Sequence, residues 1–220
     1  MKKYKNILKD HKDAAQKLKD VIPMQKAKDE NWKFIAVSKG GLVIASHIID
    51  KQKNSIDFLF SQPIVAPNNS ECEIARVCES EEIVINEKLV SAFDIKYDYI
   101  YGEARRKHEE KILGNIYKYR KGQPFKSMHN EIVLLVDDGS ETGMMLMAAL
   151  KTIMAMKPKA VYIAVPILPS DVLEHLESFT DDIFFLHNID DYVETPLYYE
   201  EYKKIDEEKI ENILGEKNEI

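Results

Sequence analysis

Short apolar runs alternate with segments of helical spacing along most of the chain. The apolar runs, each too short for a buried helix, are residues 33–37, 56–60, 83–85, 132–136, 160–165 and 183–186. Apolar residues with helical spacing occupy residues 5–22, 42–50, 97–120, 144–156, 170–178 and 206–214. Strands that alternate with helices predict an α/β fold, in which a mainly parallel sheet is flanked by helices on both faces.

Helix-capping residues mark the starts of two helical segments, and one long stretch of the chain shows no clear pattern. Asn86 and Ser170 are suitable N-caps for the helical segments that follow them. Residues 61–82 contain two prolines and little periodic pattern, so we expect a long irregular segment there, which is uncommon unless it is functional or mobile. Because the chain has no internal repeat and no low-complexity linker, we predict a single domain over residues 1–220.

Composition and charge exclude several classes of function. The formal net charge is -7, and the lysines and arginines are scattered, which argues against a nucleic-acid or membrane-surface partner. No apolar run approaches the ~20 residues that span a bilayer, and the amino-terminal residues lack the pattern of a signal peptide. Cys72 and Cys78 have no histidine near them, so two reduced thiols are expected rather than a zinc site or a disulfide. We predict a soluble, cytoplasmic protein.

The strongest candidate site follows the apolar run at 132–136. That run stops at Asp137 and Asp138, and a polar turn then leads into the next helix. The turn consists of Gly139, Ser140, Glu141, Thr142 and Gly143. Ligands of open parallel sheets bind at the carboxyl ends of the strands, and the N–H groups at a helix start bind anions.

An acid pair beside an anion-binding turn has few chemical uses. Unpaired buried carboxylates are costly, so Asp137 and Asp138 should hold a metal, accept hydrogen bonds from ligand hydroxyls or act as a base. The alternative is a tight turn followed by a serine or threonine helix cap. Hydroxyl-binding acids next to an anion site suit a sugar phosphate, and this is the interpretation that we favour.

A second unit of strand, loop and helix begins at residue 33. Its apolar run ends in Ser38, Lys39, Gly40 and Gly41. The two glycines allow close approach of the backbone to a ligand, and Lys39 supplies a cation. The alternative is an ordinary turn.

These segments resemble the type I phosphoribosyltransferases. Residues 136–143 resemble the family signature, in which a hydrophobic strand ends in two acids and a loop ending in Thr-Gly follows. Residues 34–41 resemble the pyrophosphate loop, and 83–90 and 164–167 resemble segments of a bacterial subgroup of predicted phosphoribosyltransferases. The similarity extends in order over residues 31–202. It implies a core there, with an amino-terminal and a carboxy-terminal helix packed on it.

The resemblance implies a role for each part of the candidate site. Asp137 and Asp138 would bind the ribose hydroxyls of phosphoribosyl diphosphate and stabilise the positive charge that develops on the ring. Glu141 stands where the 6-oxopurine enzymes have an acid that acts as general base, so a purine is a hypothesis. The alternative is an exposed acid that the helix dipole favours.

The resemblance also implies which residues bind the phosphates. The 5-phosphate would lie against the N–H groups of the turn, and the diphosphate, bridged by Mg²⁺, would lie against residues 38–41. The residues expected to bind phosphoribosyl diphosphate are Ser38, Lys39, Gly40, Gly41, Gly139, Ser140, Thr142 and Gly143. Residues 61–82 would be a flexible loop that closes over the site. A small variable hood would hold the base, with Trp32, 61–82 and 190–202 as candidates.

The chain departs from the family pattern at three places. Met145 replaces a hydroxyl residue of the phosphate loop, Glu141 stands where the bacterial subgroup usually has a small residue, and Lys39 replaces an arginine and so loses its bidentate fork. In addition, Arg76 is the only cation in 61–76, which is a weakly basic segment for a loop that binds diphosphate. Two functions remain open. One is transfer of phosphoribosyl to a nitrogenous base, and the other is non-catalytic binding of phosphoribosyl diphosphate or a nucleotide. The resemblance also allows a homodimer, for which residues 192–202 are a candidate interface.

Overall fold

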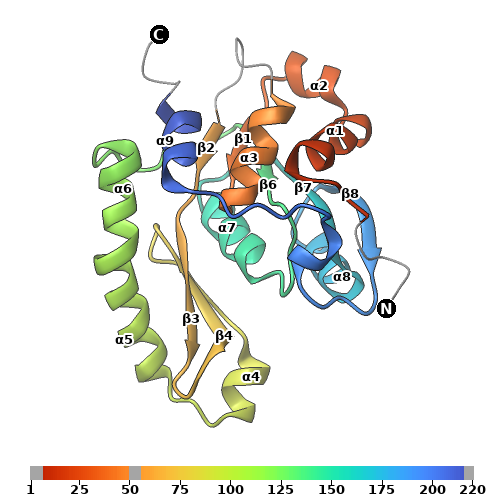
Figure 1. Ribbon diagram of the computed structural model, residues 1–220. Coiled ribbons are helices and arrows are strands. Elements are labelled where there is room, and N and C mark those ends of the chain that lie inside the picture. Colours follow the sequence, from red (N-terminus) through yellow and green to blue (C-terminus); the bar gives the residue numbers. More distant parts are fainter. Residues whose placement is uncertain (1–6, 50–55, 216–220) are drawn as a thin grey trace.

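A five-stranded, wholly parallel sheet lies at the centre of the protein (Figure 1). The computed structural model describes residues 7–49 and 56–215. The strands, in their spatial order, are β2 (Ile56–Phe58), β1 (Lys33–Ala36), β6 (Ile132–Val136), β7 (Ala160–Pro169) and β8 (Asp182–Ile189). The predicted α/β fold with a mainly parallel sheet is confirmed.

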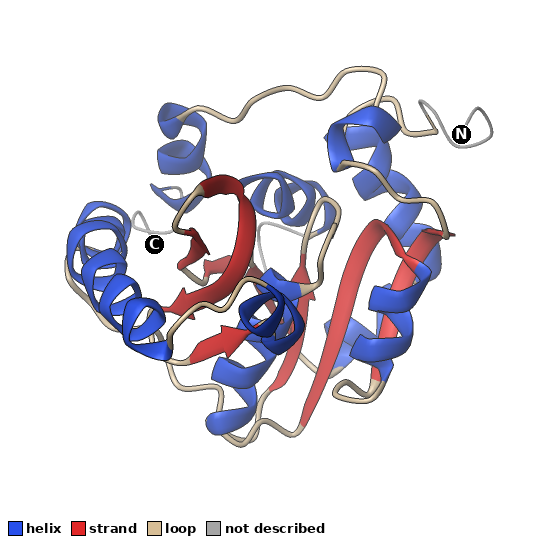
Figure 2. Ribbon diagram, turned by 90° about the horizontal axis from the view of Figure 1, so that it is seen from below, coloured by secondary structure: helices blue, strands red, loops and turns tan. Residues whose placement is uncertain are grey.

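Helices cover both faces of this sheet (Figure 2). On one face, α1 (His11–Val21) and α3 (Lys39–Ile48) share a core with Phe34 of β1. On the other face, α7 (Met144–Ala155) and α8 (Ser170–Glu177) share a second core with Ile35. Neighbouring residues of β1 thus point into different cores, because successive side chains of a strand alternate between its faces.

A small antiparallel sheet is built from residues that we expected to be irregular. It contains β3 (Ser61–Ala66), β4 (Asn69–Cys78) and β5 (Ile83–Ile85), in that spatial order. The expectation of an irregular segment over 61–82 was therefore wrong. Strand β4 is exposed in its first half and buried in its second, so it lacks the alternation by which a strand is recognised. Pro63 is tolerated because β3 is an edge strand.

One long helical segment packs against this small sheet. It consists of α5 (Tyr97–Lys107), a π-helical turn η1 (His108–Ile112) and α6 (Leu113–Arg120), and it confirms the helix expected over 97–120. The small sheet lies between α5 and α7 (Figure 1). The helix ends at Lys121, whose φ of 53° is left-handed. The short helix α4 (Glu87–Ala92) precedes it and is capped by Asn86, as predicted.

The first described residues pair with the carboxy-terminal segment. The helix expected over 5–22 begins only at His11, and Leu8 instead forms a parallel β-bridge with Tyr199. Residues 5 and 6 of that expected helix, and Asp50 of the next one, lie outside the described residues. The carboxy-terminal helix α9 (Glu207–Gly215) is confirmed, and it contacts α3 and α6.

The remaining features are the start of α8, two short helices and the two cysteines. The N-cap of α8 is Pro169 rather than Ser170, because β7 continues four residues past its expected end at 165. The remaining short helices are α2 (Met24–Asp29) and the 3-10 turn η2 (Thr195–Tyr198). Cys72 and Cys78 are both free thiols. No helix in the described ranges has the length and apolar character needed to cross a membrane.

Candidate functional site

The candidate site lies where the strand order reverses. Strand β1 pairs with β2 on one side and with β6 on the other, and Ala36 of β1 is in register with Val136 of β6. Ser38 and Asp138 each follow two residues later, so the two predicted loops meet at the carboxyl edge of the sheet. This is the crevice in which open α/β sheets bind ligands.

The Asp138 carboxylate is buried and holds three hydrogen bonds. Ser38 Oγ donates to Oδ1 at 2.8 Å, and the Tyr202 hydroxyl donates to Oδ2 at 2.8 Å. The Nε2 atom of His11 lies 3.2 Å from Oδ2, where a protonated Nε2 donates to the carboxylate. Burial by itself would raise the pKa of Asp138, but the donors from His11, Ser38 and Tyr202 outweigh it and hold that pKa below its usual range. Asp138 is therefore the charged member of the pair.

Asp137 is the member of the pair that holds a proton more readily. Its side chain is buried, and its Oδ1 accepts a hydrogen bond from the Asp138 N–H at 2.9 Å. Burial and the negative charge of Asp138 raise the pKa of Asp137 well above its ordinary value. Two adjacent buried carboxyls thus favour one negative charge between them rather than two. The acid pair offers one charged acceptor and one group that can hold a proton.

The predicted loop at 38–41 is the start of a helix. Ser38 is the N-cap of α3, and its Oγ accepts a hydrogen bond from the Gly41 N–H at 2.8 Å. A Cβ on Gly40 would lie 1.9 Å from Asp138 Oδ2, and one on Gly41 would lie 2.3 Å from the Val136 carbonyl oxygen. The glycines therefore allow α3 to approach the end of β6, an internal contact that the sequence did not indicate.

The turn at 139–143 joins β6 to α7. Gly143 is the N-cap of α7, with a left-handed φ of 71°, and a Cβ there would lie 2.8 Å from Val172. Thr142 Oγ1 accepts weakly from the Met144 N–H at 3.4 Å. The Ser140 N–H donates to the Ile167 carbonyl at 3.3 Å, so in this conformation it is engaged within the chain.

Glu141 connects the turn to the carboxy-terminal segment. Its Oε1 accepts a hydrogen bond from the Thr195 N–H at 3.0 Å, at the first residue of η2. Gly139 also lies against Thr195, because a Cβ on Gly139 would come within 2.5 Å of the Thr195 Cγ2. In this structure Glu141 thus positions residues 190–202 beside the acid pair.

The structure separates the three candidates for the hood. Trp32 precedes β1 and is buried against Tyr162, with ring centroids 4.4 Å apart, so it lies at the opposite end of the strand from the site. Residues 190–202 lie beside the acid pair. Residues 61–82 form the hairpin, whose Arg76 is buried and donates to Glu73 and Ser61 rather than presenting a free cation.

Sequence reasoning missed His11 and the two tyrosines that surround Asp138. The Tyr199 hydroxyl donates to the Asp138 backbone carbonyl at 2.6 Å, and the His11 ring stacks on Tyr199 with centroids 5.3 Å apart. The Leu8 N–H donates to the Tyr198 carbonyl at 3.0 Å, which connects the residues before α1 to the segment 190–202. The tyrosine-rich composition of 190–202 was a signal for part of this cluster, but nothing in the sequence distinguished His11.

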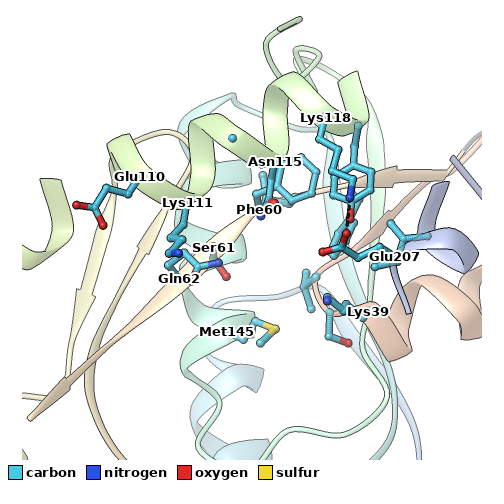
Figure 3. A pocket seen from close by; sticks show the side chains of 17 residues that line it. Lys39, Phe60, Ser61, Gln62, Glu110, Lys111, Asn115, Lys118, Met145 and Glu207 are labelled. Atoms are coloured by element: carbon cyan, nitrogen blue, oxygen red, sulfur yellow. Dashed lines mark hydrogen bonds and ion pairs between the residues drawn. The ribbon is translucent and has the colours of Figure 1, made fainter. Parts of the chain in front are cut away.

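A cleft of about 480 Å³ opens beside Ser38 and Lys39 (Figure 3). Its walls come from the carboxyl ends of β1 and β2, from β3, and from α3, η1, α6, α7 and α9. Polar side chains from these walls include Lys39, Ser61, Gln62, Glu110, Lys111, Asn115, Lys118 and Glu207. Lys118 forms ion pairs with Glu207 at 2.5 Å and with Glu211 at 3.2 Å. The cleft thus presents cations and oxygen atoms next to Ser38, whose Oγ donates to Asp138, although the acid pair itself does not line the cleft.

Two curated proteins from Mycobacterium tuberculosis are similar to this chain. They are named "Putative phosphoribosyl transferase Rv0571c" and "Putative phosphoribosyl transferase MT0597", and each is 22% identical to it over 152 residues. The match covers 69% of this chain and 34% of each relative, so the chain spans about a third of the length of these proteins. No protein-family model matches the chain.

A solved crystal structure is similar to this protein in fold. The crystal structure of TT1426 from Thermus thermophilus is 24% identical and superposes with a TM-score of 0.73, covering 94% of this chain and 97% of that one. The two proteins share a fold. The mycobacterial relatives, by their names, confirm that the chain resembles phosphoribosyltransferases.

Proposed function

We propose that the protein binds phosphoribosyl diphosphate and transfers its phosphoribosyl group to a nitrogenous base, with release of diphosphate. One observation carries the proposal. Buried Asp137 and Asp138 end the central strand β6, at the point where the helices α3 and α7 begin on opposite faces of the sheet. Two helix starts favour two anionic groups, and the acid pair between them suits the hydroxyls of a sugar.

Each group of residues has a role in this proposal. Asp138, held ionised by its donors, accepts a ribose hydroxyl and stabilises positive charge on the ring as the glycosidic bond breaks. The turn 139–143 binds the 5-phosphate after Ser140 exchanges its bond to Ile167 for one to the ligand. Lys39, at the first turn of α3 and on the wall of the cleft, attracts the departing diphosphate.

The proposal includes Mg²⁺ bound mainly through the diphosphate. Carboxylate and amide oxygens of Glu110, Glu207 and Gln62 on the cleft walls are hard donors of the type that Mg²⁺ and its bound waters prefer. Mg²⁺ with Lys39 would neutralise the negative charge of the leaving diphosphate. We assign no direct protein ligand to the ion.

The test is the release of diphosphate. The protein is incubated with phosphoribosyl diphosphate, MgCl₂ and a panel of purines and pyrimidines, and diphosphate and nucleotide are measured. Asp138→Asn should lower kcat/KM by about 10²-fold, because it removes the charge that stabilises the transition state. Asp98→Asn changes an exposed acid of α5 and serves as the matched control. Turnover that survives in Asp138→Asn contradicts the proposed role.

The acceptor is proposed to be a purine, and Glu141 allows this part to be tested separately. Glu141→Gln keeps an oxygen that can accept from the Thr195 N–H, whereas Glu141→Ala removes it. A general base predicts that both variants lose kcat on purines. If Glu141 only positions residues 190–202, Glu141→Gln retains activity and the inference of a purine is lost.

A second function is favoured by a specific observation. The acceptor atoms of Asp138 and the Ser140 N–H are already bonded within the chain, and Met145 replaces a phosphate-binding hydroxyl. These features suit a protein that binds phosphoribosyl diphosphate or a nucleotide without turnover. Saturable binding that Asp138→Asn abolishes, without diphosphate release for any base in the panel, would establish this second function and refute the first.

A further inference from the structure

The Asp138 carboxylate already binds a hydroxyl group in this structure, and the group belongs to the chain itself. The Tyr202 O–H donates to Oδ2 at 2.8 Å. A phenol and a sugar hydroxyl are the same kind of donor, and both seek the lone pairs of an ionised carboxylate. The proposed ribose site and the observed tyrosine site therefore share an acceptor.

The three side chains bonded to Asp138 differ in their freedom to leave it. Ser38 is fixed, because its Oγ also accepts the capping hydrogen bond from Gly41. His11 is buried on α1, stacked on Tyr199 and packed against the core that α1 shares with α3. Neither side chain can move without disturbing a helix.

Tyr202 is held much less firmly. Its side chain is 39% exposed, and residues 202–206 have no regular secondary structure. The last backbone bond before it is the one from the Glu201 N–H to the Lys9 carbonyl at 2.9 Å. Residues 203 and 204 are exposed. A change of the Tyr202 rotamer, or a shift of the short segment up to α9, releases the carboxylate while the bridge at Leu8 stays intact.

We propose that Tyr202 occupies the hydroxyl-binding position of Asp138 in the absence of ligand and is displaced when a sugar hydroxyl binds. The inference rests on the proposed binding of phosphoribosyl diphosphate, and it names the residue that competes with that ligand. His11 and Ser38 stay bonded and keep the carboxylate oriented. Tyr202 thus lowers the affinity for the sugar, and it gives the buried carboxylate a third donor while no ligand is bound.

The test compares Tyr202→Phe with the wild-type protein by calorimetric titration of phosphoribosyl diphosphate. Phenylalanine keeps the ring that packs on His11 and Tyr199 and removes the competing donor. We expect binding to tighten by about threefold to tenfold, since a hydrogen bond to a charged group contributes appreciably but this one is partly solvated. Inorganic phosphate, which has no sugar hydroxyl, should bind equally to both proteins. Tyr101→Phe, an exposed position on α5, is the matched control.

Hydrogen exchange provides a second readout that a structural role for Tyr202 would not produce. In the wild-type protein, the Glu201 amide, which donates to the Lys9 carbonyl, should exchange faster once phosphoribosyl diphosphate is added, whereas in Tyr202→Phe it should exchange faster from the start. Equal or weaker binding by Tyr202→Phe, with exchange of the Glu201 amide unchanged by the ligand, refutes the displacement and leaves the proposed function standing. Failure of both proteins to bind phosphoribosyl diphosphate refutes the proposed function itself.

Discussion

The contact between α3 and β6 makes a sharp prediction about Gly41. A Cβ at this position would lie 2.3 Å from the Val136 carbonyl oxygen and 2.9 Å from Asp137 Cα, whereas ordinary contacts begin near 3.4 Å. Both neighbours are backbone atoms of the central sheet, so no side chain can rotate to make room. Gly41→Ala must therefore separate the start of α3 from β6 by about 1 Å.

The size of the effect follows from two opposing terms. Overpacking of a well-packed interior costs about 1–3 kcal/mol, and alanine regains about 1 kcal/mol over glycine inside a helix. A clash with fixed backbone belongs at the upper end of the first range, so we expect Gly41→Ala to lower the free energy of unfolding by about 2 kcal/mol. Gly102→Ala in α5 meets no atom within 4 Å and should raise it by about 0.5–1 kcal/mol.

Urea unfolding followed by far-ultraviolet circular dichroism measures this difference. The slope of the free energy with urea should be unchanged, and the midpoint should fall for Gly41→Ala and rise for Gly102→Ala. Gly40→Ala differs in kind, because its Cβ would meet the Asp138 side chain at 1.9 Å. It should displace that carboxylate and weaken sugar-phosphate binding. A Gly41→Ala protein as stable as Gly102→Ala would refute the close approach of α3 to β6.

Three further predictions concern buried charge and the phosphate loop. Because the pKa of Asp137 is raised in the folded state, its carboxyl lowers the free energy of unfolding as pH rises from about 4 through that folded pKa. Asp137→Asn should therefore be more stable than the wild-type protein at pH 7 and show no such gain at pH 3. Thermal unfolding at the two pH values measures the difference. Arg120→Met leaves the buried Glu79 carboxylate without its ion pair and should lower the free energy of unfolding by about 3 kcal/mol at pH 7. The loss should be smaller at pH 4, where Glu79 can be protonated. Lys118→Met at an exposed pair is the control, and an equal loss in both variants would contradict this account. Met145→Thr adds a hydroxyl at the start of α7, beside the proposed phosphate site, and should tighten phosphate binding by up to about tenfold. Isothermal titration can detect this change. Unchanged binding would show that the side chain at 145 does not reach the phosphate.

The sequence predicted the parallel sheet well because its strands have a simple signature. Strand β6 is buried at all five of its residues and reads as an uninterrupted apolar run. Strand β4 was missed because its exposure changes along its length, from exposed at Asn69 to buried at Cys78. That gradient arises from which part of the hairpin packs between α5 and α7, and no local pattern encodes it.

The sequence predicted only part of the candidate site, because only part of the site is a local pattern. Asp137 and Asp138 follow directly from an apolar strand that stops at two acids, which is a local pattern. The partners of Asp138 come from residues 11, 38 and 202, so more than 60 positions separate the acid from each of them. A single histidine on a helix carries no signal of such a contact, and only folding brings it to the acid.

The sequence by itself determined the fold class, the order of the main elements and the position of the acid pair, because these depend on the alternation of apolar and polar residues over a few positions. The tertiary structure decided the charge states and the hydrogen-bond partners of the acid pair. It made Asp138 a charged acceptor and raised the pKa of Asp137, and it used both glycines of α3 for an internal contact. Protonation and hydrogen bonding at a buried site depend on every group within a few ångströms, and those groups come together only when distant segments pack.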